Sequence, residues 1–229
     1  MNRTVGVVTL VFAGAMACSG SAPAKPERCL EPAREAEPTN VFVLVQGTCQ
    51  FMTQCELDGG AETSLEAING FFAKISNGVP APTQIGVIDY GGDPTLLAPL
   101  GPPAALAAPI LGPAAEYNKV IVSALRLGLT QAYRRLRGLP GRKVIVIIGD
   151  GQTVNGYLGV ERILETVAPF HAAGIELHAL GVRSRPGHDR EDSRHRLRNL
   201  ADPDRYREFE EAGDGLALAS AFASIVSSP

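Results

Sequence analysis

The chain has 229 residues, of which 45% are hydrophobic and 20% charged, a composition typical of a folded globular protein and not of a disordered one. Its formal net charge of −3 gives no basic surplus of the kind that marks proteins binding DNA or RNA. A chain of this length can bury one large hydrophobic core and does not require two domains.

The first residues are typical of a secretion signal. Arg3 supplies a positive start, and residues 5–17 form an apolar run of 13, shorter than the roughly 20 residues of a membrane-spanning helix. Small residues then precede Cys18, which resembles a bacterial lipobox, in which the cysteine is lipidated and becomes the new N-terminus. The usual Leu three positions earlier is Ala15 here, so an ordinary signal peptide is the alternative. We expect residues 1–17 to be the signal peptide and, since no Asp follows Cys18, the outer membrane to be the destination.

Residues 18–38 are rich in Pro, Ala, Ser and charge, which predicts a lipidated cysteine followed by a flexible tether, with the folded domain at residues 39–229. In an oxidising compartment the three other cysteines allow three single pairings and leave one thiol over. Cys49 and Cys55 are the closest in sequence, so we predict a disulfide between them, with Cys29 paired to either one as the alternative.

Beyond the tether, strand-like runs alternate with helical patterns. Val41–Val45 is apolar without alternation, which predicts a strand buried on both faces. Thr63 and Glu66 form a capping box at the start of a helix. Later strands are predicted at residues 85–90, 143–148 and 175–182, with an edge strand near 96–97 inside an irregular excursion over 91–115. Later helices are predicted at about residues 118–137, 160–173 and after Asp214.

This alternation predicts an α/β fold of the Rossmann-like, doubly wound kind, with a mostly parallel central sheet flanked by helices. Function in such sheets lies in loops at the carboxyl ends of the strands. The candidate loops therefore follow Val45, Tyr90 and Ile148, together with the turn before the long helix.

Three segments together resemble the von Willebrand factor A domain over about residues 39–227. Residues 41–52, VFVLVQGTCQFM, stand where that family has an apolar strand ending in Asp-x-Ser-x-Ser-Met. Residues 143–152, KVIVIIGDGQ, stand where it has a strand ending in Thr-Asp-Gly. Residues 174–182, the charged run after them and a last helix with Phe222 and Ile225 match its final strand and helix.

That family's hallmark is a metal-ion-dependent adhesion site, in which two serines, a threonine and two aspartates hold a divalent cation. The resemblance places Gln46 at the first aspartate, Thr48 and Gln50 at the serines, Asp150 at the second aspartate, and Asn118 and Lys119 near the threonine. One carboxylate and one hydroxyl remain, Asp150 and Thr48, a poor set for Mg²⁺. We therefore expect a degenerate adhesion site without a metal or other cofactor, in which only Thr48 and Asp150 could still contact Mg²⁺.

Without a cation, the Asp150 carboxylate needs other partners, because an unpaired buried carboxylate is costly. The amide of Gln46 can donate to it and fill the space that a cation would occupy. The sequence therefore predicts a polar plug in which the former ligand positions hydrogen-bond one another.

Two other groups of residues could carry chemistry. His188, Asp189, Asp192 and His195 lie close together, but they sit among arginines in a run with no burial pattern, which favours a solvated segment over a metal site. Cys49 follows a strand as a nucleophile might, yet a phosphatase loop would need an Arg six residues later, where Cys55 stands. No nucleophile elbow, dinucleotide fingerprint or P-loop occurs, so we do not expect an enzyme.

These observations predict a protein-binding or adhesion module on the cell envelope that works without a metal. Its partner would be another envelope or surface protein, with no nucleic acid bound and the membrane reached through the lipid anchor only. The alternatives are a metal-dependent adhesin with a non-standard ligand shell and an enzyme on a Rossmann-like sheet. The sequence leaves open which face of the outer membrane carries the domain.

Overall fold

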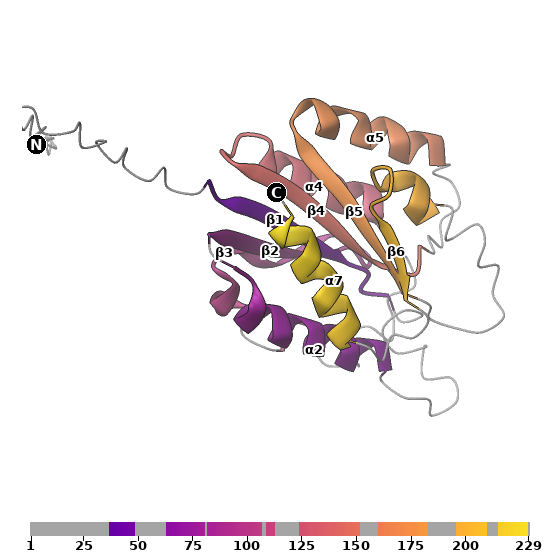
Figure 1. Cartoon of the computed structure of the whole chain (residues 1–229). Helices are drawn as coiled ribbons and strands as arrows, with labels where there is room; N and C mark the ends of the chain where they lie inside the picture. Colours follow the sequence, from indigo (N-terminus) through magenta and orange to yellow (C-terminus); the bar gives the residue numbers. More distant parts are fainter. Residues whose placement is uncertain are drawn as a thin grey trace, which may run out of the picture. The chain divides into compact units, whose positions relative to one another are not determined.

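The computed structural model describes residues 37–48, 63–80, 82–106, 109–112, 124–151, 160–182, 196–209 and 215–228, which all belong to one compact unit of the chain, Ala36–Pro229. Its centre is a six-stranded sheet of order β3-β2-β1-β4-β5-β6 (Figure 1). The strands are β1 (Thr39–Val45), β2 (Thr83–Asp89), β3 (Thr95–Gly101), β4 (Arg142–Gly149), β5 (Ile175–Val182) and β6 (Tyr206–Phe209). Neighbouring strands are parallel except for the antiparallel pair β2–β3.

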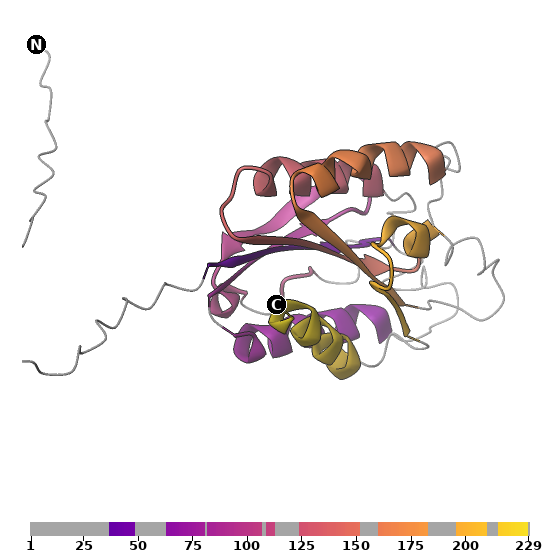
Figure 2. The ribbon, with the colours of Figure 1, turned by 45° about the horizontal axis from the view of Figure 1, so that its top comes forward.

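Helices cover both faces of the sheet. The helices α2 (Thr63–Gly78) and α7 (Gly215–Ser227) lie on one face, and α4 (Leu125–Leu136) and α5 (Val160–Ala172) lie on the other (Figure 2). A short 3-10 helix, η2 (Pro103–Ala105), follows β3. The predicted α/β fold, with a mostly parallel, doubly wound sheet, is therefore confirmed.

The central strand β1 explains why the sheet needs both helical layers. Val41, Val43 and Val45 pack in the core beneath α2 and α7, whereas Phe42 and Leu44 pack beneath α4 and α5. Each of these five side chains is at most 1% exposed. Alternate residues of a strand point to opposite faces, so an unbroken apolar run is stable only where both faces are covered.

Several element boundaries differ from those predicted. The edge strand expected near residues 96–97 is present as β3. The long helix predicted over about residues 118–137 is seen as α4, which begins only at Leu125 because Ala124 is its N-cap, with φ −110° and ψ 46° outside the helical region. Residues 118–123 lie outside the described part. The strand β6 was not predicted: its four residues, Tyr-Arg-Glu-Phe, are half-buried or exposed, which is too short a pattern to recognise. Among the described helices, none is both long enough and apolar enough to cross a bilayer.

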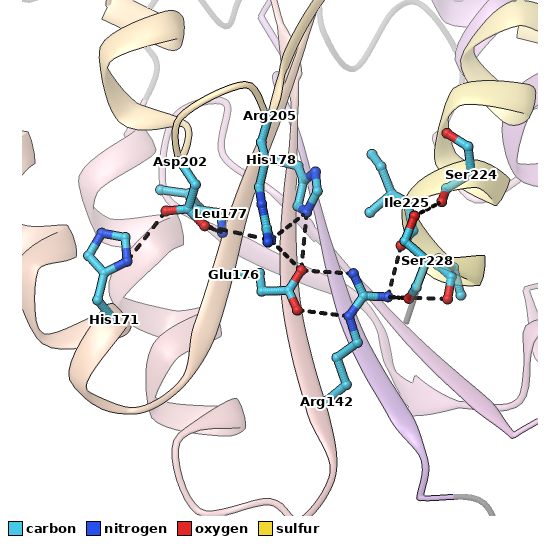
Figure 3. A network of polar contacts seen from close by, with 11 residues as sticks. Arg142, His171, Glu176, Leu177, His178, Asp202, Arg205, Ser224, Ile225 and Ser228 are labelled. Carbon is cyan, nitrogen blue, oxygen red and sulfur yellow. Dashed lines mark hydrogen bonds and ion pairs between the residues drawn. The ribbon is translucent and has the colours of Figure 1, made fainter.

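A polar network at the amino end of the sheet holds the last helix in place (Figure 3). Arg142, the first residue of β4, donates to both carboxylate oxygens of Glu176 on β5, at 2.8 and 2.7 Å. Its remaining terminal nitrogen donates to the backbone carbonyls of Ile225, Val226 and Ser228 at 2.8, 3.2 and 2.8 Å. The last carbonyls of a helix lack partners within the helix, so Arg142 caps the carboxyl end of α7.

Glu176 holds this network together because it also accepts a hydrogen bond from Arg205 and lies 3.4 Å from His178 Nε2. Partial burial alone would raise the pKa of Glu176. Hydrogen bonds from Arg142 and His178, together with the charges of Arg142 and Arg205, outweigh burial and hold that pKa well below its ordinary value of 4.5. The carboxylate therefore stays ionised in the folded protein to a lower pH than in the unfolded chain.

Replacing Glu176 by Gln should destabilise the domain by about 1–3 kcal/mol at neutral pH, because the two arginines lose their anionic acceptor. A lowered folded-state pKa contributes stability that is present above the unfolded pKa and lost below it. The gap in unfolding free energy between wild type and Glu176→Gln should therefore shrink as the pH falls below about 4.5, the ordinary value. Urea titrations at several pH values measure it. Glu165→Gln, which changes an exposed glutamate of α5, is the control and should cost little at any pH.

Candidate functional site

The carboxyl ends of β1, β2 and β4 meet at one edge of the sheet. In the strand register, Val45 lies opposite both Asp89 and Ile148. The backbone N–H of Gln46 donates to the carbonyl of Ile148 at 3.1 Å, and that of Tyr90 donates to the carbonyl of Val45 at 2.8 Å. Three of the loops singled out from the sequence are thus brought together by the parallel pairing itself.

The side-chain amide of Gln46 connects the first and last of these loops. Its Nε2 donates to Asp150 Oδ1 at 2.8 Å and to Thr48 Oγ1 at 3.2 Å. Its Oε1 accepts from the backbone N–H of Asp150 at 3.1 Å and from the hydroxyl of Tyr90 at 3.3 Å. An amide has two donor hydrogens and two acceptor lone pairs, so every bonding position of Gln46 is used. The predicted hydrogen bond from Gln46 to Asp150 is therefore present.

The surroundings of Gln46 permit only one orientation of its amide. If nitrogen and oxygen were exchanged, Oε1 would face the Asp150 carboxylate and Nε2 would face the backbone N–H of the same residue. In the orientation present, one nitrogen donates to Asp150 and Thr48, the two groups that could have contacted a cation. Hard cations require several anionic or neutral oxygens directed at one point. The described groups fit a hydrogen-bonded plug better than a cation shell.

Tyr90 and Gly149 complete the surroundings of this amide. Tyr90 is 1% exposed, and burial, followed by the charges of Asp150 and Asp89, raises the pKa of its phenol well above 10. The phenol therefore stays protonated, and its one hydrogen can be donated to Gln46 Oε1 at 3.3 Å or to the Ile148 carbonyl at 3.4 Å. A Cβ atom on Gly149 would lie 2.3 Å from the Tyr90 hydroxyl and 2.5 Å from Gln46 Oε1. Only glycine lets β4 pass this close to the plug.

Asp89, the last residue of β2, is a second acid at this edge, although its sequence pattern predicted only a position within a strand. Its side chain is buried, with 9% exposed, and accepts the backbone N–H of Gly91 at 2.7 Å and also that of Gly47. A Cβ on Gly47 would lie 2.1 Å from Asp89 Oδ1, and one on Gly91 would lie 1.9 Å from the Gly47 carbonyl oxygen. The sequence signal for this close approach was a glycine shortly after each of the adjacent strands β1 and β2.

The two acids at this edge have different surroundings. Asp150 is half-buried and accepts from a side-chain amide. Burial raises the pKa of Asp89 from 3.8 to about 6, although the hydrogen bonds from Gly91 and Gly47 act in the opposite direction. Backbone N–H groups carry no full charge, so they only partly offset the loss of hydration.

Other candidate residues lie outside the described part of the chain. These are Cys18, Cys29, Cys49, Gln50, Cys55, Asn118, Lys119 and the group at His188, Asp189, Asp192 and His195. The lipidation, the disulfide and the contribution of Gln50 to the plug therefore stay predictions. Within the described residues, no group of three or more His, Cys, Asp or Glu side chains is placed to hold a metal ion.

The sequence model of the von Willebrand factor type A domain matches residues 56–222, well over half of the chain. The chain therefore belongs to this family. The match begins after β1 and after the loop that carries Gln46 and Thr48. The loop that in the family carries most of the metal ligands is thus outside the matched segment. No curated protein sequence matches the chain.

Solved structures share the fold at low sequence identity. The pilus adhesin SpaC from Lactobacillus rhamnosus GG is 15% identical, with a TM-score of 0.63 over 84% of this chain and 31% of its own. Proximal thread matrix protein 1 from the mussel byssus is 15% identical, with a TM-score of 0.61 over 83% of this chain and 46% of its own. The von Willebrand factor domain of the type V pili tip protein Mfa5 from Porphyromonas gingivalis is 10% identical, with a TM-score of 0.59 over 83% of this chain and 94% of its own. The chain thus spans less than half of the first two proteins.

Asp89 should make the stability of the domain depend on pH. Its pKa is higher in the folded state than in the unfolded chain, so the folded state holds the extra proton between about pH 4 and 6, and stability falls as the pH rises through that window. Asp89→Asn cannot ionise, so its unfolding free energy should lack this fall, which amounts to on the order of 2–3 kcal/mol for such a shift. Chemical denaturation of both proteins from pH 4 to pH 7 measures the difference. Equal pH dependence in both would contradict the assignment to Asp89.

Proposed function

We propose that this chain is a protein-binding module of adhesive type, anchored to the cell envelope, whose contact surface is formed by the loops after β1, β2 and β4 and works without a metal ion. The observation that carries this proposal is the fully bonded amide of Gln46 between Thr48 and Asp150. Domains of this family act mainly as interaction modules, which favours binding of a protein over catalysis.

The absence of a metal requirement follows from charge. A Mg²⁺ ion gives up part of its hydration only for strongly coordinating oxygens, among which carboxylates contribute most. Gln46 stands at the position of the family's first aspartate. Its amide nitrogen is a hydrogen-bond donor, and the partial positive charge on its hydrogens would repel a cation. Asp150 is then the only carboxylate among the three former ligand positions that the structure describes, and its Oδ1 already accepts a hydrogen bond.

The adhesive part of the proposal is supported by two similar structures, a pilus adhesin and a pilus tip protein. Their identities of 15% and 10% concern the fold alone, so the contact surface here is argued from its own residues. The backbones of two loops touch at Gly47 and Gly91, and the plug joins the first of these loops to Asp150. A surface that is preorganised in this way loses little conformational freedom when a partner binds.

Metal independence can be tested directly. EDTA or millimolar Mg²⁺ or Mn²⁺ should leave the melting temperature unchanged, and EDTA should leave the retention of envelope proteins on the immobilised chain unchanged. Asp150→Ala should lower the unfolding free energy by about 1–3 kcal/mol, because the Gln46 amide loses a charged acceptor. Differential scanning fluorimetry and urea titration measure these quantities.

A matched variant separates a plug from a metal site. Gln46→Glu has nearly the same shape but places a second carboxylate against Asp150, so it should destabilise the domain at neutral pH and recover as the pH falls. A melting temperature that rises with Mg²⁺ in the wild type, and no longer rises in Asp150→Ala, would show that the site binds metal and refute this part of the proposal.

The anchoring part rests on the small residues before Cys18. Cys18→Ala should move the protein from the membrane fraction to the soluble fraction, since the acyl chains would no longer be attached. Fractionation followed by immunoblotting measures this, with Cys29→Ala as the control that should stay in the membrane. A wild-type protein found in the soluble fraction would contradict lipidation.

A further inference from the structure

The outer surface of α4 is strongly basic in a chain that is acidic as a whole. Residues 124–143 contain six basic residues and no acidic one, whereas the whole chain has a formal net charge of −3. Four of the six are exposed arginines on or next to α4, namely Arg126, Arg134, Arg135 and Arg137. The charged residues of this segment are therefore all of one sign.

Three of these arginines share one face of the helix. At about 100° per residue, Arg126, Arg134 and Arg137 lie within an arc of roughly 80°, outside the buried stripe of the helix. That stripe consists of Leu125, Leu129, Ala132 and Leu136. The three arginines cover about 17 Å along the axis, since a helix rises about 1.5 Å per residue. We call Arg126, Arg134 and Arg137, with Leu127 beside them, the basic face.

Described acidic residues do not neutralise the basic face. The ion pairs between described residues involve Arg142, His171, His178 and Arg205, which lie elsewhere. The Arg137 guanidinium lies 5.9 Å from the centre of the Tyr133 ring, a contact that orients the side chain and leaves its charge in place.

The basic face also carries exposed apolar surface. Leu127 lies about 20° beyond Arg134 around the helix and is 46% exposed. Leu164 of the neighbouring helix α5 is 40% exposed, and α4 and α5 lie side by side on the same face of the sheet (Figure 2). Arginines beside an exposed leucine on a surface helix suit an interface between water and lipid, where the charges meet headgroups and the leucine reaches the acyl boundary.

We propose that the basic face of α4 docks on a membrane surface containing anionic phospholipids. Each basic residue near such a surface is attracted to it by about 1 kcal/mol, within roughly a Debye length. A single-stranded nucleic acid would be expected to meet exposed aromatic side chains for stacking, and the aromatic residue of α4, Tyr133, instead stacks on Phe170. This inference goes beyond the lipid anchor and depends neither on it nor on the plug.

The test is co-sedimentation of the full chain with vesicles. One set is phosphatidylcholine alone, and the other is phosphatidylcholine and phosphatidylglycerol in equal parts. We expect binding that is stronger on the anionic vesicles and weakens as salt is raised. Replacing Arg126, Arg134 and Arg137 together by Gln should reduce the ratio of affinities for anionic and neutral vesicles about a hundredfold, or roughly fivefold per arginine. The apolar residues 5–17 and any acyl chain are common to all variants, so the difference between the two vesicle types isolates the charge effect.

The matched control changes the same net charge at other sites. Lys74→Gln, Arg198→Gln and Arg207→Gln together remove three exposed positive charges outside α4 and should retain the preference. Circular dichroism and melting temperature establish that both triple variants are folded. Equal binding of the wild type to both vesicle types would overturn the proposal. So would a control triple variant that loses its preference for anionic vesicles as much as the α4 triple variant does. Binding to polyglutamate or duplex DNA without any preference for anionic vesicles would also overturn it, because the partner would then be an acidic protein or a nucleic acid.

Discussion

The site depends on one constraint, which is that the Asp150 carboxylate lies where three parallel strands end and must be held by groups from neighbouring strands. Gln46 meets this constraint with a single amide that donates to the carboxylate and accepts from the backbone N–H of the same residue. The Gln46 side chain carries no charge, and its donor and acceptor positions all take part in hydrogen bonds. It fixes the carboxyl ends of β1 and β4 to one another, so the geometry of the proposed contact surface follows from it.

The same edge of the sheet contains two carboxylates with contrasting chemistry. Asp150 is only half-buried and accepts from an amide, whereas Asp89 is buried and accepts from two backbone N–H groups. The close approach of Gly47 and Gly91 seals Asp89 beneath the loops, which is why its pKa is raised. At the opposite end of the sheet, Glu176 is surrounded by full positive charges, and its pKa is lowered instead. Local partners, and not the fold alone, therefore decide the charge state of each acid.

Much of the architecture could be predicted because the sheet is parallel and doubly covered. Unbroken apolar runs such as Val41–Val45 are incompatible with a solvent-exposed face, and their alternation with helical patterns leaves few topologies. The bond between Gln46 and Asp150 was predictable because family resemblance placed the two residues at one site and chemistry required a partner for the carboxylate. Asp89 and β6 were missed for a different reason. The burial of Asp89 depends on contacts with glycines of two loops, and β6 is a four-residue strand that forms by pairing with β5. Both features arise from residues far apart in the sequence and leave almost no local sequence signal.

The two proposed surfaces are built from different parts of the fold. Loops at the carboxyl ends of the strands occupy an edge of the sheet, whereas α4 lies across one of its faces (Figure 2). A protein partner at the edge would meet a preorganised surface in which the Asp150 carboxylate is already hydrogen-bonded, so binding there depends on shape more than on charge. The basic face of α4 has the opposite character, because its attraction is electrostatic, long in range and sensitive to salt. Neither surface uses the other's residues, but the N–H of Ala124 donates to the Tyr90 carbonyl at 2.7 Å, so α4 begins beside the loop after β2 and contact with a membrane would orient the domain with that loop near the lipid surface.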